Sequence, residues 1–143
     1  MSTHFATRTS VPIERSRQEI EETLKRYGAT AFGFMHSADR AIIAFEAKGR
    51  NIKISMTVPA EDKDKGGQRR RQKWRALLLV IKAKLESVES GIETLEEAFF
   101  ANIVLPDGQT VYEATRKNVQ IAYDSGKVQK LLPDYRSDAQ GRG

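Results

Sequence analysis

The spacing of apolar residues changes twice along this chain of 143 residues, and this change restricts the fold more than any other feature. From residue 32 to residue 58, apolar side chains alternate with small or polar ones, which is the period of a half-buried β-strand. The alternating positions are Phe32 and Phe34, then Ile43, Phe45 and Ala47, then Ile52, Ile54, Met56 and Val58. They predict three strands joined by short turns at residues 37–39 and 48–51. We expect an antiparallel meander with one buried and one polar face.

The segments around this stretch have the spacing of helices. Ser16 and Glu19 match a capping box, and Gly28 is a favourable residue just past a helix end, so a helix over about residues 16–27 is predicted. A second helix follows the polar hinge at residues 60–68. Its apolar stripe comprises Trp74, Leu77, Leu78, Ile81, Leu85, Val88 and Ile92. Steps of three and four residues place this stripe on one face, and we expect it to be the central core element.

Two further capping boxes predict helices in the C-terminal third. They run from Thr94 to Glu97 and from Thr110 to Glu113, and they begin helices of about 94–104 and 110–125. The predicted fold is therefore α+β, with an N-terminal helix, a three-stranded antiparallel meander, a long central helix and two C-terminal helices. We expect a flexible arm over residues 1–11, one domain over 12–133 and a disordered tail over 134–143.

Positive charge is concentrated in one segment of the chain. No acidic residue lies between Asp64 and Glu86, whereas eight Lys and Arg residues do, so the rest of a chain with net charge +5 carries −3. The run RRRQKWR coincides with the expected start of the long helix, where the helix dipole disfavours cations. Helix N-terminal amides and clustered guanidinium groups both complement phosphate oxygens. The candidate nucleic-acid-binding residues are Lys65, Arg69, Arg70, Arg71, Lys73 and Arg75.

The basic segment has another interpretation, and so does the tryptophan within it. The cations could be solvated residues that pair with the neighbouring acidic groups Glu61, Asp62 and Asp64, as charged runs commonly are. Trp74 lies between Lys73 and Arg75, where an indole could stack on a base, but it also begins the apolar stripe, which favours a place in the core.

Catalytic motifs are scarce, and the sequence favours a non-enzymatic role with no metal and no cofactor. The chain has no cysteine, and neither His4 nor His36 has a second ligand at a metal-binding spacing. One weak pattern is left. Asp39, Glu46 and Lys48 resemble the Asp and Glu-x-Lys arrangement of restriction-endonuclease-like nucleases, which would imply metal-assisted phosphodiester cleavage by these residues.

The amino-acid sequence of several stretches resembles that of a family of short, uncharacterised bacteriophage and prophage proteins. The matching stretches are residues 74–86, 103–108, 11–16 and 26–28, and the resemblance covers most of residues 11–133. It implies a mobile genetic element and the cytoplasm of a host cell, with no activity to transfer residue by residue. In outline, the order of helix, three strands and long helix also resembles phage single-strand annealing proteins.

The function that we expect is a phage-type nucleic-acid-binding accessory protein, which holds phosphate backbones during recombination or replication. The single-stranded form of DNA is one candidate ligand. The alternative is a small phage-encoded inhibitor that binds a host defence or transcription protein. A membrane partner is not expected, because the longest apolar run, residues 76–81, is far shorter than the roughly 20 residues of a membrane span. The first strand has no charge between Thr30 and Ala38, so its edge could pair with a second copy in a homo-oligomer.

Overall fold

The computed structural model describes residues 11–128 and 130–133, and its sheet has the predicted order and direction. Strands β1 (Thr30–His36), β2 (Arg40–Ala47) and β3 (Arg50–Thr57) form an antiparallel sheet in the order β1-β2-β3. The expectations of an N-terminal arm and a C-terminal tail fall almost entirely on residues 1–10 and 134–143, which lie outside the described residues.

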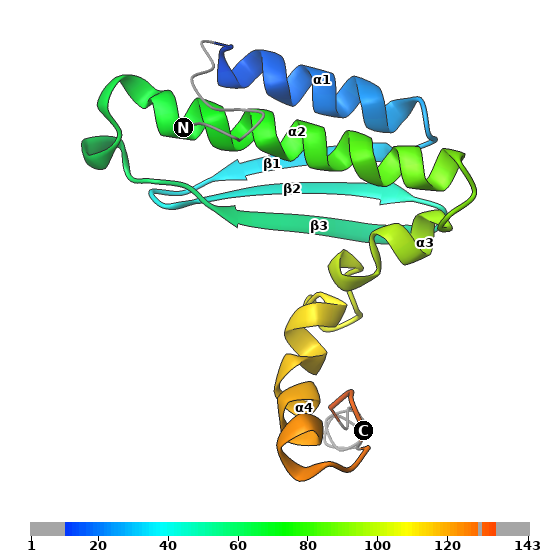
Figure 1. Ribbon diagram of the computed structural model, residues 1–143. Helices are drawn as coiled ribbons and strands as arrows, with labels where there is room; N and C mark the ends of the chain where they lie inside the picture. The colour runs from blue at the N-terminus through cyan, green and yellow to red at the C-terminus, as the bar shows by residue number, and fades with distance from the viewer. Residues whose placement is uncertain (1–10, 129, 134–143) are drawn as a thin grey trace, which may run out of the picture.

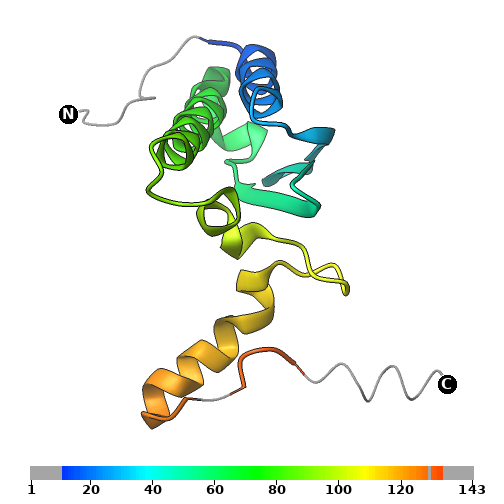
Figure 2. The ribbon, with the colours of Figure 1, turned by 90° about the vertical axis from the view of Figure 1, so that its right-hand side faces the viewer.

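Two helices cover one face of this sheet. Helix α1 (Ile13–Lys25) and helix α2 (Gln68–Glu89) lie side by side above the strands (Figures 1 and 2). Alternate residues of β2 face these helices, and Ile43 and Phe45 are almost fully buried there. From α2, the predicted stripe supplies Leu78, Ile81 and Leu85 to the same core. The predicted place of the long helix in the core, against the buried face of the meander, is confirmed.

The first helix begins earlier than its capping signal indicated. Ser16 does not cap it, because the helix begins at Ile13, directly after Pro12, and Ser16 is a fully buried helical residue. Proline has a fixed φ that suits the start of a helix, and its missing N–H costs nothing there. The long helix ends at Glu89, so Ile92 lies beyond it and is mostly exposed.

The C-terminal third contains both predicted caps but only one long helix. The capping boxes of Thr94 and Thr110 are present as expected, at the starts of α3 (Leu95–Ala98) and α4 (Val111–Ser125). The predicted helix of about 94–104 is wrong after Ala98. A 3-10 turn over Phe100–Asn102 follows, and Ile103 then forms an antiparallel bridge with Ile52 of β3. This bridge satisfies backbone groups at the edge of the sheet, which a longer helix would leave unpaired.

Helix α4 projects away from the sheet and its two covering helices (Figures 1 and 2). None of its side chains is buried among the described residues, although Tyr112, Ile121 and Tyr123 are large and apolar. Among the described residues, Glu113 of α4 forms an ion pair with Lys53 of β3 at 3.9 Å. Within the described residues, no helix is long and apolar enough to cross a membrane.

Candidate anion-binding site

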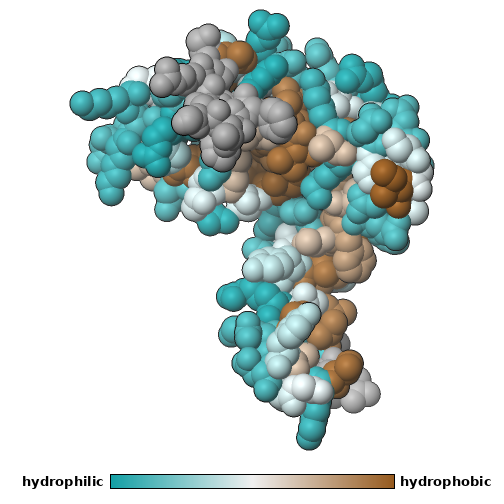
Figure 3. Space-filling model, in the orientation of Figure 1, coloured by the Kyte–Doolittle hydropathy of each residue, from teal (hydrophilic) through white to brown (hydrophobic). Residues whose placement is uncertain are grey.

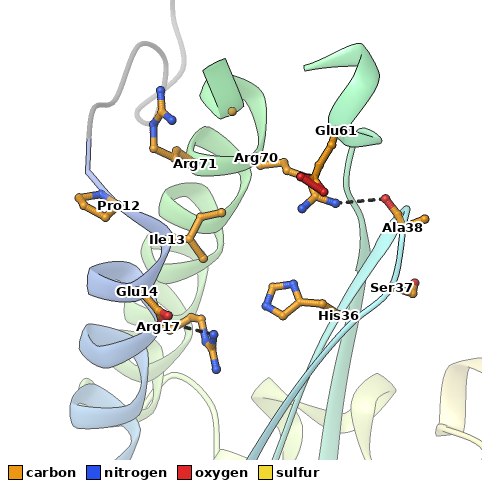
Figure 4. A pocket seen from close by; sticks show the side chains of 11 residues that line it. Pro12, Ile13, Glu14, Arg17, His36, Ser37, Ala38, Glu61, Arg70 and Arg71 are labelled. Atoms are coloured by element: carbon orange, nitrogen blue, oxygen red, sulfur yellow. Dashed lines mark hydrogen bonds and ion pairs between the residues drawn. The ribbon is translucent and has the colours of Figure 1, made fainter. Parts of the chain in front are cut away.

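Three segments of the chain meet at one end of the sheet: the start of α1, the turn between β1 and β2, and the start of α2 (Figure 4). The topology requires this meeting, because each antiparallel strand reverses the direction of the chain. The 3-10 turn directly before α2, Lys65–Gly67, contains Gly66 and Gly67 with φ of 67° and 71°, and this left-handed backbone suits glycine. The turn is followed directly by α2, so the basic segment begins at this end of the molecule.

Asp64 occupies the N-terminus of α2. Its carboxylate accepts hydrogen bonds from the backbone N–H of Arg69 at 2.8 Å and from that of Arg70 at 2.9 Å. Burial by itself raises the pKa of Asp64, but these two hydrogen bonds and the nearby guanidinium charges outweigh burial, so its pKa lies below the ordinary value. The expectation that these helix amides bind phosphate is therefore wrong, because the chain supplies its own anion there.

Three of the six predicted residues have partners within the protein. Arg70 donates from Nε to the carbonyl of Pro59 at 2.9 Å and from a terminal nitrogen to the carbonyl of Ala38 at 3.1 Å. Arg71 donates to the carbonyl of Gly66, and also to the Gln68 side chain at 3.1 Å. These contacts attach the start of α2 to the loop before it and to the β1–β2 turn.

Arg75 forms an ion pair with Glu19 that joins α2 to α1. The hydrogen bond from Arg75 is the main cause that lowers the pKa of Glu19, and the charge of Arg75 adds to it. Both side chains are less than one-third exposed, at 26% and 29%. Arg75 therefore contributes to helix packing, and its guanidinium is not a free cation.

The other three predicted residues are exposed. Among the described residues, no hydrogen bond or ion pair occupies the side chains of Lys65, Arg69 and Lys73. Arg69 and Lys73 are four residues apart in α2, so they lie on the same face of the helix in successive turns. Lys65 precedes them in the 3-10 turn. We call Lys65, Arg69 and Lys73 the exposed basic face.

Trp74 is a core residue. Its indole is 1% exposed and lies against Phe34, with a ring distance of 6.4 Å, and against His36, with a ring distance of 5.5 Å. The interpretation of Trp74 as a base-stacking residue is therefore wrong for this structure, since no face of the ring reaches solvent. The reason is its position in the apolar stripe, which is turned toward the sheet.

A cleft of about 750 Å³ lies between α1, the β1–β2 turn and α2, and we call it the arginine cleft (Figure 4). Arg70 and Arg71 line it, as do Arg17 from α1 and His36 from the end of β1. Sequence analysis did not identify Arg17 or His36 as site residues. No local pattern marks them, because they are far apart in the sequence and only the fold places both of them beside α2.

Two contacts hold Arg17 in the arginine cleft. Its guanidinium lies 4.5 Å from the centre of the Phe34 ring, and it forms an ion pair with Glu14 at 3.4 Å. His36 points from β1 toward this part of α1 (Figure 4). Burial lowers the pKa of His36, and the positive charges of Arg17 and Arg70 lower it further. The imidazole is thus mainly neutral near pH 7.

The nuclease-like residues are not brought together. Asp39 and Glu46 lie at opposite ends of β2, separated by roughly 20 Å at about 3.3 Å per residue. Lys48 is in the β2–β3 turn with φ of 53°, and does not share a strand face with Glu46. Among the described residues there is no group of three or more His, Asp and Glu side chains that could hold a metal ion.

The chain was compared with models of protein families, with curated proteins and with solved structures, and none of the three comparisons gave a match. The chemistry of the site is therefore argued from its own residues. These residues provide cations and N–H donors at one end of the fold, and such groups bind anions.

Proposed function

We propose that the protein binds nucleic acid by its phosphate backbone, at the end of the fold that carries the exposed basic face. One observation carries this proposal: Lys65, Arg69 and Lys73 are exposed, Arg69 and Lys73 lie on one face of α2, and no acidic side chain among the described residues pairs with them. Flexible, unpaired cations of this kind bind phosphates without reading base edges. The resemblance to phage proteins supports an accessory role in recombination or replication inside a host cell.

This mode of binding has a measurable signature. Each phosphate contact releases condensed counterions, so the logarithm of the binding constant falls linearly with the logarithm of the salt concentration. The slope is about −0.9 for each contact on duplex DNA and about −0.7 on a single strand. Affinity should depend strongly on salt and little on base sequence.

The decisive experiment is a titration of fluorescent single-stranded and double-stranded DNA and RNA at several salt concentrations. Arg69→Gln/Lys73→Gln should weaken binding and make the salt slope shallower by about two contacts. The matched control is Arg116→Gln/Lys117→Gln, which removes two exposed cations from α4 and should leave the slope unchanged. The proposal fails if no oligonucleotide binds at low salt, or if both double variants bind like the parent protein.

A second candidate function rests on a different surface. An apolar groove of about 890 Å³ lies between the segment after α3 and the first half of α4. Among its lining residues, Phe100, Tyr112, Leu131 and Leu132 are each more than 40% exposed. Figure 3 shows apolar surface gathered along one side of this C-terminal part. Exposed apolar surface of this kind is typical of protein interfaces, and it favours the alternative of an inhibitor that binds a host protein.

The two candidates can be separated by affinity capture from nuclease-treated host lysate. If the groove binds a host protein, a stoichiometric partner should survive nuclease treatment and be lost with Tyr112→Asp. It should be retained with Arg69→Gln/Lys73→Gln, because those cations are at the other end of the fold (Figure 1). Loss of every partner after nuclease treatment would leave nucleic acid as the ligand.

A further inference from the structure

The arginine cleft differs from the exposed basic face in how its donors are held. Arg17 is fixed by the Phe34 ring and by Glu14, and Arg70 is fixed by two backbone carbonyls. Guanidinium groups held in this way lose little conformational entropy when they bind a ligand. A flexible cation on the helix surface has no such advantage, so the two regions suit different kinds of phosphate contact.

Some donors in the cleft have no acceptor. The Nε atoms of Arg17 and Arg71 are buried, and neither forms a hydrogen bond with any described residue. A buried N–H without an acceptor costs free energy, and a ligand oxygen would recover this cost where the side chain turns toward the cleft. Arg70 also keeps donors for a ligand, because a guanidinium has five N–H groups and the described residues engage only two of its nitrogens.

The cleft has a net charge of +1, and its three guanidinium groups can donate to the three terminal oxygens of a phosphate monoester. Three guanidinium groups, from Arg17, Arg70 and Arg71, exceed the two carboxylates that also line the cleft, from Glu14 and Glu61. A phosphate monoester carries −1.5 to −2 near neutral pH and has three terminal oxygens, whereas each backbone diester carries −1. His36 also lines the cleft, and a bound dianion would attract a proton to its imidazole.

We propose that the arginine cleft binds a phosphate monoester, namely the terminal phosphate of a nucleic-acid strand whose backbone lies on the exposed basic face. This inference rests on the proposed function, and it adds recognition of a strand end through Arg17, a residue that lies outside the basic segment. The exposed basic face would supply affinity that does not depend on the end, and the arginine cleft would supply the preference for a phosphorylated end.

The test uses the full chain and three versions of one oligonucleotide, with a 5′-phosphate, a 3′-phosphate or hydroxyl groups at both ends. One phosphorylated version should bind about tenfold more tightly than the hydroxyl version, as one or two charge-assisted hydrogen bonds would give. Arg17→Gln should abolish this preference and leave the affinity for the hydroxyl version unchanged. Arg15→Gln, on the exposed side of the same helix, is the matched control and should retain the preference.

Competition with inorganic phosphate and with a nucleoside monophosphate distinguishes the sources of the monoester. If the protein binds these small molecules through Arg17 but binds no oligonucleotide, both the strand-end inference and the proposed function are wrong. If all three oligonucleotides bind equally, with strong salt dependence, the proposed function stands and the inference about the cleft is overturned. Thermal melting checks that Arg17→Gln and Arg17→Lys are both folded. Arg17→Lys keeps the positive charge, so it should retain part of the preference for the phosphorylated end.

Discussion

The carboxylate of Asp64 accepts a hydrogen bond from the backbone N–H of Arg70 at 2.9 Å, directly before the most basic segment of the chain. It does the same for the N–H of Arg69. An acidic residue thereby satisfies the helix amides that an external phosphate would otherwise bind. This contact caps the backbone at the start of α2, while the side chains of Arg69 and Lys73 remain available.

Asp64→Ala should lower stability and strengthen anion binding at the same time. The variant loses the acceptor for two partly buried N–H groups, so its denaturation midpoint falls, while those N–H groups become free for a phosphate oxygen. Chemical denaturation and an inorganic phosphate titration measure the two effects. A variant that is as stable as the parent would show that this cap contributes nothing.

The Asp64 contact also predicts a dependence on pH. Folding lowers the pKa of Asp64, so its stabilisation is present above its ordinary pKa, near 4, and is lost as the pH falls through the lower pKa of the folded state. Stability of the parent should therefore decline below about pH 4 more steeply than that of Asp64→Ala.

Arg75→Gln should affect stability and leave nucleic-acid binding unchanged. Its ion pair with Glu19 joins the two helices, and loss of a partly exposed, charge-assisted pair costs about 1 kcal/mol in the free energy of unfolding. A double-mutant cycle with Glu19→Gln measures this coupling by denaturation. Should Arg75→Gln make the salt slope of binding shallower as Lys73→Gln does, Arg75 would contact phosphate after all.

Trp74 should report on the core and not on the ligand. The chain has one tryptophan, so its emission comes from this buried indole alone. We expect blue-shifted emission that oligonucleotides do not quench, in a titration where anisotropy shows binding. Trp74→Ala should lower the free energy of unfolding by about 3–5 kcal/mol. Strong quenching at saturation would contradict the burial of the ring.

Self-association stays a prediction, and β1 is the edge to test. Its outer side pairs with no strand among the described residues, while Phe32 and Phe34 are half-buried against the core. If two copies pair through β1, light scattering should show a dimer, and Met35→Lys should convert it to a monomer by placing a charge on the edge strand. Val128→Lys, at an almost fully exposed position far from β1, is the control. A monomeric parent protein in moderate salt would overturn this prediction.

Local sequence patterns predicted the elements and most of their ends, because these depend on neighbouring residues. The alternation around Ile43 and Ile52 predicted the strands, and the capping boxes at Thr94 and Thr110 lie where local hydrogen bonds place them. It failed at Ser16, which has the residue type of a cap but is covered by tertiary packing.

Which of the predicted cations have partners depends on the packing of the fold. The six predicted residues all carry a positive charge, and the sequence does not distinguish them. In the structure, Arg70, Arg71 and Arg75 have acceptors that come from other turns and elements. The helix that should have ended at 104 ended early because Ile103 pairs with Ile52, 51 positions before it in the chain. Arg17 and His36 are candidate site residues because the fold places both of them in the arginine cleft. Contacts between distant residues depend on the packed fold, and no local pattern encodes which side chain will lie opposite which.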